Sequence, residues 1–288
     1  MSAPSPVCGP ILHVAINYKT TVRAQRFVER FAESRGQASS ISLLVVDNSD
    51  GDELGLLSRQ IDRRHPGVRC LTAPTNLGYF GGARFGLEQA HDSAPAWTIV
   101  SNVDLAHDAA ALERSLATHD PDGVAAIAPR IVSAASGREL NPYMRTRPSS
   151  LKMHAYKYFY RSYRGLRAYS WLSDRVARSR IAPRDAPMTP GERVYAAHGC
   201  FLILSRGYFA RGGSLRHDPF LFGEEISIGE QARRIGLPTV CDPSIVITHD
   251  DHASTGKLPG RAIHAYQRDA VAWLVSEFFR ESRRPEPE

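Results

Sequence analysis

Short apolar runs alternate with amphipathic segments along the first 130 residues of the chain. Near-continuous apolar runs are typical of strands covered on both faces, and they predict strands at residues 11–17, 41–46, 68–71, 97–105 and 124–127. Apolar residues at helical spacing predict helices at about residues 21–34, 54–64, 83–91 and 110–119. This alternation predicts an open, mostly parallel α/β sheet flanked by helices.

The pattern resumes near residue 190, after an interruption. Residues 194–204 and 238–247 are strand-like, whereas residues 224–235 and 262–279 have helical spacing. We expect one domain over residues 11–280, with an insertion at residues 143–190 between two halves at 11–130 and 191–280. The two ends, residues 1–10 and 281–288, are expected to be flexible.

Polar side chains stand where several predicted strands end. Asn102 and Asp104 lie one residue apart after an apolar run, a spacing that places both on the same side of a strand. Asp47 ends another predicted strand. Ligands of open α/β sheets bind at the carboxyl ends of strands, where Asp104 suits a divalent metal on two phosphates and Asp47 suits a base or ribose hydroxyl. The alternative is that Asp104 only starts a loop, that Asp108 caps the next helix, and that Asp47 forms an Asx turn.

Three further groups of residues could take part in catalysis or in substrate or metal binding. Glu224 and Glu225 start a predicted helix, where the helix dipole favours carboxylates, but either could also be a general base. His249 and His252 follow a predicted strand, three residues apart. His198 precedes a glycine at a close approach, and it either faces a substrate or is a hydrogen-bonded, partly buried histidine.

The segment at residues 76–86 is rich in glycine. Backbone N–H groups at a helix start, with Arg84 nearby, suit a diphosphate. The spacing matches neither the dinucleotide fingerprint nor a P-loop, so the glycines alone do not identify a nucleotide site.

Composition and charge narrow the class of protein. The 288 residues carry a formal charge of +6, yet residues 143–184 alone hold eleven Lys or Arg against one Asp, so the rest of the chain is net acidic. Eight aromatic side chains interleave with these basic residues. Such a segment suits the binding of anionic headgroups, a phosphate-bearing acceptor or single-stranded nucleic acid. The alternative is an arm whose aromatic side chains pack on the domain and whose arginines are solvated.

Other features indicate a cytoplasmic location. No apolar run reaches the roughly twenty residues that span a membrane, and the N-terminus lacks the features of a secretory signal. The four cysteines are scattered and form no CxxC pair, which argues against a zinc site or a disulfide framework.

Taken together, residues 11–257 resemble the family 2 glycosyltransferases, which have the GT-A fold. Within that family the chain is most similar to bacterial enzymes of surface-polysaccharide synthesis, including rhamnosyltransferases. The stretches that carry the resemblance are VVDNSDGDE, NLGYFGGARFG, SNVDL, GCFLILSRGYF, FLFGEEISIGEQARRIG and ITHDDHASTGK.

The resemblance implies a donor site. Asp47 would contact the base or ribose, and Asn76, Gly78 and Arg84 would line the nucleotide site. Asp104 matches the last acid of the family's DxD motif. It would bind Mg²⁺ or Mn²⁺ on the donor diphosphate.

It also implies an acceptor side. His249 matches the histidine that closes the metal site, and Glu225 falls on the catalytic base. His198, Gly199, Glu224 and His252 would lie on the acceptor side.

The chain departs from the family at four positions. The family's Glu-Asp pair is Glu224-Glu225 here, so the base would be a glutamate, one methylene longer than the family's aspartate. Asn102 stands where the DxD motif often has its first acid, and Ser227 and Ile228 replace the Asp-Leu that follows the base. The resemblance implies an inverting transfer of a sugar from a nucleoside diphosphate donor to a glycan or lipid-linked acceptor, with a peripheral membrane contact by the basic segment. The alternatives are a sugar nucleotidyltransferase and a non-catalytic relative; a nucleic-acid binder is disfavoured because no reader motif is present.

Overall fold

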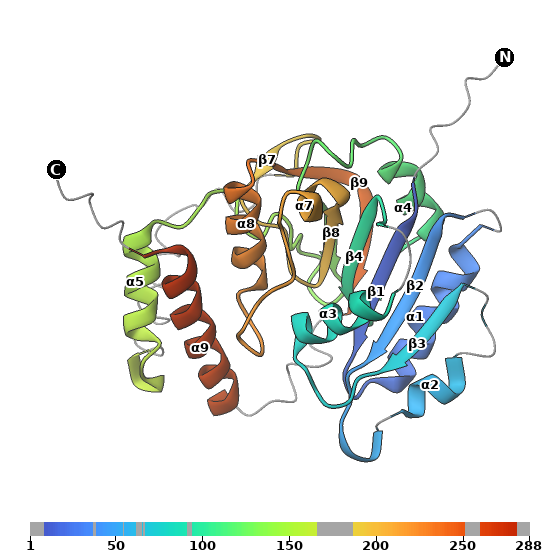
Figure 1. The fold of residues 1–288 in the computed structure, drawn as a ribbon, viewed down its shortest axis with the longest axis horizontal. Coiled ribbons are helices and arrows are strands. Elements are labelled where there is room, and N and C mark those ends of the chain that lie inside the picture. Colours follow the sequence, from blue (N-terminus) through green and yellow to red (C-terminus); the bar gives the residue numbers. More distant parts are fainter. Residues whose placement is uncertain are drawn as a thin grey trace.

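One twisted sheet runs through the centre of the computed structural model, with helices on both of its faces (Figure 1). The structure describes residues 9–36, 39–53, 55–61, 65, 67–90, 94–165, 187–250 and 260–280. Its strands are β1 (Ile11–Asn17), β2 (Ile41–Asp47), β3 (Val68–Thr72), β4 (Trp97–Asn102), β5 (Leu105–Ala106), β6 (Ala126–Ser133), β7 (Arg193–Val194), β8 (Phe201–Ser205) and β9 (Thr239–His249). Its α-helices are α1 (Thr21–Ser34), α2 (Leu56–Ile61), α3 (Tyr79–Gln89), α4 (Ala109–Leu116), α5 (Ser150–Phe159), α7 (Arg206–Ala210), α8 (Glu224–Arg234) and α9 (Gly260–Phe278).

The strand order is β3-β2-β1-β4-β8-β6-β9-β5, and β7 also pairs with β9. Strand β1 is parallel to β2 and β4, and β6 is parallel to β9, whereas β8 runs antiparallel between β4 and β6. Strands β1, β2, β4 and β9 therefore end at the same edge of the sheet. This topology confirms the predicted α/β class with a mostly parallel sheet.

Two apolar layers explain why the central strands read as unbroken hydrophobic runs. Helices α1, α2 and α4 bury their apolar stripes against one face of the sheet, and α3, α7 and α8 cover the other. Helix α3 lies especially close to the sheet, because a Cβ atom at Gly86 would come within 2.8 Å of the side chains of Val14 and Val46. The strands are thus buried on both faces, as parallel strands usually are.

Helices α5 and α9 stand together beside α8 and away from the sheet (Figure 1). They run antiparallel: Ser150, at the start of α5, donates to the carbonyl of Phe279 beyond the end of α9 (3.2 Å), and Tyr163 packs edge-on against His264 near the start of α9. Within the described part of the predicted basic insertion, α5 is helical and so are residues 163–165. Residues 166–186 of the insertion lie outside the described residues.

Three predicted elements are corrected by the structure. Helix α3 begins at Tyr79 rather than at residue 83, so most of the glycine-rich segment is helical, and Gly86 lets the helix pack closely on the sheet. The predicted strand at 194–204 is split into β7 and β8 by a turn at residues 195–200. Strand β6 continues past Pro129, where the register with β9 shifts, since a bulge accommodates the missing N–H of proline.

Candidate functional site

The acid that ends β2 is fixed by the residue that ends the neighbouring strand. Asn17 donates through Nδ2 to Asp47 Oδ1 at 3.1 Å, and the N–H of Ser49 donates to the same oxygen at 3.3 Å. The second oxygen, Oδ2, is buried and accepts no hydrogen bond from any described residue. Because an unsatisfied buried carboxylate oxygen is costly, Asp47 is suited to accept a hydrogen bond from a ligand at this edge.

Asn48 ties the glycine-rich segment to the same edge. Its Oδ1 accepts from the N–H of Leu77 at 2.9 Å, and its Nδ2 donates to Asn76 Oδ1 at 3.1 Å and to the carbonyl of Gly78 at 2.9 Å. Gly78 has a φ of +73°, and a Cβ atom there would lie 2.2 Å from the carbonyl oxygen of Phe220. The structure thus brings Asn76 and Gly78 to Asp47, in a loop that tolerates only glycine at position 78.

Arg84 lies elsewhere. It is in the second turn of α3 with an exposed side chain, and its ionic partner is Glu88 at 3.7 Å, one turn further along the helix. Among the described residues it has no contact with Asp47 or Asp104, so its role in diphosphate binding stays a prediction.

Asp104 and His249 are brought together by the pairing of β5 with β9. Leu105 is opposite His249, and the N–H of Asp250 donates to the carbonyl of Asp104 at 2.9 Å. Both side chains are buried, and Asp104 Oδ1 lies 3.6 Å from His249 Nε2. That Oδ1 atom accepts no hydrogen bond from the part of the chain the structure describes.

A carboxylate oxygen and an imidazole nitrogen at this separation fit the donor set of a divalent cation. Within the described ranges no third His, Cys, Asp or Glu completes a protein-only cluster, so the described residues would supply two ligands. Asn102 ends β4 two residues before Asp104, where its N–H donates to the carbonyl of Cys200 at 3.0 Å. His252 lies outside the described residues.

Two left-handed residues turn the chain into α8. Phe222 has a φ of +73° and Gly223 a φ of +88°, and a Cβ atom at Gly223 would come within 2.8 Å of the Leu274 side chain. The turn sends the two acids in different directions. Glu224 Oε1 accepts from the N–H of Phe222 at 3.1 Å, whereas Glu225 Oε1 accepts from the N–H of Gly199 at 3.2 Å.

Both acids resist ionisation. Burial raises the pKa of Glu224, and the charge of Glu225 raises it further, while the hydrogen bond from the N–H of Phe222 opposes that rise. Burial also raises the pKa of Glu225, while the hydrogen bond from Gly199 opposes that rise. Because two neighbouring buried carboxylates repel each other, the pair holds one proton more readily than an exposed pair would.

Tyr79, at the start of α3 on the donor side, contacts the turn that holds Glu225. The sequence did not predict this contact. The Tyr79 hydroxyl donates to the carbonyl of Gly199 at 2.7 Å. Burial raises the pKa of Tyr79 well above its usual range, and Cys200, Glu224, Glu225 and Asp104 add to the effect. The first residue of α3 therefore stands among the predicted metal and base residues.

His198 lies between the two groups of predicted residues. Its ring centroid is 6.4 Å from that of His249, and its N–H donates to Asn141 Oδ1 at 2.7 Å. Its Nδ1 accepts from the N–H of Cys200 at 3.2 Å, so the neutral ring carries its proton on Nε2. The structure thus brings His198, Gly199, Glu225, Asp104 and His249 into one region.

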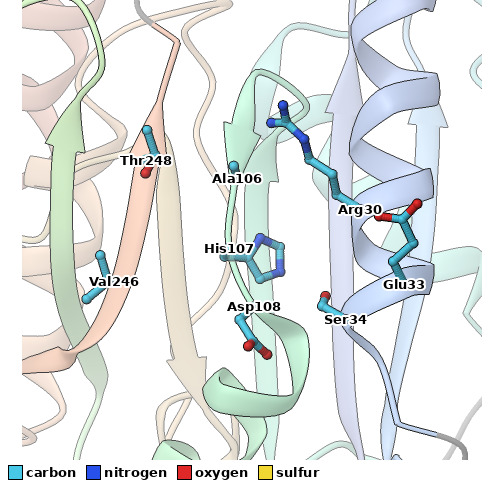
Figure 2. Close-up of a pocket in the computed structure, with 8 residues that line it drawn as sticks. All are labelled: Arg30, Glu33, Ser34, Ala106, His107, Asp108, Val246 and Thr248. Carbon is cyan, nitrogen blue, oxygen red and sulfur yellow. The ribbon is translucent and has the colours of Figure 1, made fainter.

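A separate hollow lies between α1, the turn from β5 to α4, and β9 (Figure 2). None of the predicted site residues lines it. Its lining residues are Arg30, Glu33, Ser34, Ala106, His107, Asp108, Val246 and Thr248.

Comparison with known proteins identifies a sequence family, a related enzyme and solved structures of similar fold. The sequence model of the family described as "Glycosyl transferase family 2" matches residues 18–186. N-acetylglucosaminyl-diphospho-decaprenol L-rhamnosyltransferase of Mycobacterium tuberculosis is 24% identical over 276 residues, which cover 91% of this chain and 83% of that protein.

Two solved structures are similar in fold. The first is GalNAc-T7 with UDP, GalNAc and Mn²⁺, with a TM-score of 0.58 and 14% identity over 84% of this chain. This chain spans only 44% of the length of GalNAc-T7. The second is the mannosyltransferase PcManGT from Pyrobaculum calidifontis in complex with GDP-Man and Mn²⁺, with a TM-score of 0.54 and 16% identity, covering 98% of this chain and 68% of that one.

Proposed function

This chain belongs to glycosyl transferase family 2 and has the GT-A fold, and we propose that it transfers a hexosyl or deoxyhexosyl unit with inversion from a nucleoside diphosphate to a hydroxyl of a glycan or lipid-linked acceptor. The observation that carries the proposal is the convergence of the Asp104–His249 pair and Glu225 on the same turn at Gly199 and His198. We assign donor binding to residues 11–130 and the base and acceptor side to residues 191–280.

The donor nucleotide would lie along the edge formed by β1, β2 and α3. Asp47 Oδ2 supplies a buried acceptor for a base N–H or a ribose hydroxyl. Asn76 and Gly78 form the adjacent loop, and Asn102 ends the neighbouring strand. Both solved structures similar in fold contain a nucleotide, UDP in one and GDP-Man in the other, which supports a nucleoside diphosphate at this edge.

Asp104 and His249 would hold Mn²⁺ or Mg²⁺ at the diphosphate. Both similar structures contain Mn²⁺. A divalent cation bound here would neutralise charge on the departing diphosphate. The protein's own contribution is to fix the two ligands through the β5–β9 pairing and to bury them away from water.

Glu225 would act as the general base. The acceptor hydroxyl gives its proton to Glu225 while its oxygen attacks the anomeric carbon from the face opposite the diphosphate. One C–O bond forms, the bond to the phosphate oxygen breaks, and the single displacement inverts the anomeric configuration. Glu224 faces the turn at Phe222 rather than Gly199, so it would not compete as a base.

The acceptor class follows from the relative. The rhamnosyltransferase acts on N-acetylglucosaminyl-diphospho-decaprenol, as its name states, so we propose an L-rhamnosyl donor and a diphosphate-linked prenyl sugar as acceptor, in the synthesis of a bacterial surface polysaccharide. None of the helices among the described residues is long and apolar enough to cross a membrane. We therefore propose that the chain meets such an acceptor at the cytoplasmic face through a peripheral contact made by the basic segment.

One experiment tests this function. The purified protein is incubated with dTDP-, UDP- and GDP-linked L-rhamnose, glucose and mannose, an N-acetylglucosaminyl diphosphate on a short prenyl chain, and Mn²⁺ or Mg²⁺. We expect one donor to give a product whose anomeric coupling shows inversion, and the Glu225→Gln variant to give none. Formation of a nucleotide sugar from a nucleoside triphosphate and a sugar phosphate would instead establish a nucleotidyltransferase. Donor binding without any turnover would indicate a non-catalytic protein.

A further inference from the structure

Tyr143 is held beside the proposed base by two ties between distant segments. Met144 and Ala196 exchange backbone hydrogen bonds of 3.1 and 3.0 Å, and Asn141 accepts the N–H of His198 at 2.7 Å. Tyr143 lies between these ties, and its ring meets that of His198 edge-on, with centroids 5.7 Å apart and an interplanar angle of 86°. Two segments more than fifty residues apart thus form an aromatic corner.

This corner, formed by Tyr143 and His198, lies near both the proposed base and the Asp104–His249 pair. The residue after His198 is Gly199, whose N–H contacts Glu225, and the ring of His198 is 6.4 Å from that of His249. Tyr143 is nevertheless 39% exposed, which is unusual for a large side chain held this firmly. An exposed aromatic face next to a proposed catalytic carboxylate indicates a ligand surface.

The chemistry of the corner also favours a neutral, hydroxyl-rich ligand. The charge of Glu225 raises the pKa of Tyr143, with burial, Glu224 and the tyrosines Tyr160 and Tyr156 of α5 adding to the effect. The phenol therefore stays protonated and can donate. The N–H of Cys200 donates to His198 Nδ1, so the ring proton is on Nε2.

A sugar ring fits these features better than a nucleotide base does. A pyranose has an apolar C–H face that can lie on an aromatic ring, and a rim of hydroxyls that accept from phenol and imidazole donors. The donor base would lie at Asp47 on β2, whereas Tyr143 enters from the segment between β6 and α5, on the side of Glu225. Binding in this corner would hold an acceptor hydroxyl near the base.

We propose that Tyr143 and His198 form the subsite for the acceptor's sugar ring, with the ring face on Tyr143 and a ring substituent hydrogen-bonded to His198 Nε2. This inference rests on the proposed function, because it presumes that the base serves a sugar acceptor. By orienting the ring, the corner would favour the attacking hydroxyl over bulk water.

The test compares Tyr143→Ala and Tyr143→Phe with a control outside the basic segment, Val22→Ala, whose residue is 61% exposed on α1. The acceptor probe is an N-acetylglucosaminyl diphosphate on a short prenyl chain, without membranes. We expect Tyr143→Ala to raise the acceptor KM by about tenfold, Tyr143→Phe to raise it by less, and the control to leave it unchanged. Nucleoside diphosphate affinity, measured by calorimetry, and the midpoint of thermal unfolding should be the same in all of them.

The results separate failure of the subsite from failure of the function. An acceptor KM within twofold of wild type in Tyr143→Ala overturns the subsite, as does an equal loss of donor affinity. If Tyr143→Ala does not fold, Tyr143→Leu and Tyr143→Phe give the same comparison between aliphatic and aromatic side chains. If the wild type transfers no sugar, the proposed function fails. Saturation-transfer NMR of the acceptor probe, which requires no turnover, then still detects or rejects a sugar contact that Tyr143→Ala abolishes.

Discussion

The backbone N–H of Gly199 donates to Glu225 Oε1 at 3.2 Å, and the contact leaves no room for a side chain at residue 199. A Cβ atom there would lie 2.7 Å from that oxygen. The carbonyl of the same glycine accepts from Tyr79, so both of its backbone groups are engaged. Gly199 thus positions the proposed base from one side while α8 carries it from the other.

We therefore expect Gly199→Ala to displace Glu225 and to lower kcat by about a hundredfold, since misplacement by about an ångström can cost that much. Nucleoside diphosphate affinity should be retained, because the donor edge at Asp47 is not in contact with Gly199. Steady-state kinetics with calorimetry of the nucleotide checks both quantities. Wild-type turnover in the variant would show that Glu225 needs no support from this turn.

The two neighbouring acids should differ sharply in importance. Glu225→Gln keeps the size of the side chain but cannot take a proton, so we expect turnover to fall by about 10²–10⁴ with donor affinity unchanged. Glu224→Gln should be mild, because Glu224 faces the turn at Phe222 and its bond with the N–H of Phe222 can be made by an amide oxygen. If Glu224→Gln is the inactive variant, the base is Glu224 and the assignment is off by one residue.

Metal dependence should reside in Asp104 and His249. We expect Mn²⁺ to strengthen the binding of a nucleoside diphosphate to wild type, and Asp104→Ala to abolish that gain because it removes the buried carboxylate that faces His249. Asp108→Ala is a suitable control: this acid caps α4 by accepting from the N–H of Ala111 at 2.8 Å and does not face His249. Calorimetry with and without Mn²⁺ measures the effect. A metal-dependent gain that survives Asp104→Ala would exclude this acid as a ligand.

Much of the sheet could be predicted from the sequence, because strands buried on both faces appear there as uninterrupted runs of apolar residues. Strand β1 and helix α1 have the predicted bounds, since uninterrupted apolar runs and helical spacing encode them locally. The sequence predicts the start of α3 four residues too late, because glycines are typical of loops. In the structure, Gly82 and Gly86 are helical and allow α3 to pack closely on β1 and β2. The sequence predicts a strand where the structure has a turn at His198. The apolar run around this residue is typical of a strand, and nothing in it signals the tertiary contact of Gly199 with Glu225.

Some site residues could likewise be predicted from the sequence, and others could not. Asp47, Asp104 and His249 stand at strand ends, so topology alone gathers them at one edge. Tyr79 and Tyr143 reach the site through a helix start and a distant β-bridge, and no spacing in the sequence signals either contact. The roles predicted for these residues are tested only by the experiments proposed above.

A pair of histidines, the buried His13 and the half-buried His107 that lines the hollow of Figure 2, predicts a loss of stability in acid. The rings of His13 and His107 are 5.2 Å apart, among Phe27, Phe31 and Phe201. Burial lowers the pKa of His107 to about 4 and holds the pKa of His13 well below its usual range. The folded state therefore binds fewer protons than the unfolded chain once the pH falls below about 6.5, so stability is lost from there toward pH 4.

His107→Phe should remove part of this acid sensitivity. Neither ring nitrogen of His107 has a hydrogen-bond partner among the described residues, and its neighbours are aromatic, so phenylalanine fits the site. We expect the difference between the unfolding free energies at pH 7 and pH 4.5 to shrink by on the order of 2 kcal/mol, measured by urea titration. Parallel losses in wild type and variant would mean that His107 is not the group that titrates.

The described part of the basic segment should bind anionic membranes in a salt-dependent way. On α5, Leu151 is 81% exposed and Tyr158 67% exposed, and Arg161 and Arg164 follow on the same exposed stretch. Each basic residue near an anionic leaflet contributes up to about 1 kcal/mol, and exposed aromatic rings favour the headgroup region. We therefore expect co-sedimentation with anionic liposomes at low salt, and weaker binding to neutral liposomes or at high salt.

The variant Arg161→Gln/Arg164→Gln should weaken this binding by about tenfold, a loss of about 1.4 kcal/mol, which lies within the up to about 1 kcal/mol that each of the two basic residues contributes. The control Arg26→Gln/Arg30→Gln makes the same change in net charge on α1, which lies on the other side of the molecule from α5 (Figure 1). If the surface of α5 is the contact, only the first variant loses binding, and the loss disappears in high salt. Equal losses in both variants would mean that net charge alone drives the association. Binding that ignores lipid charge would make α5 a solvated face packed on α9, without a membrane role.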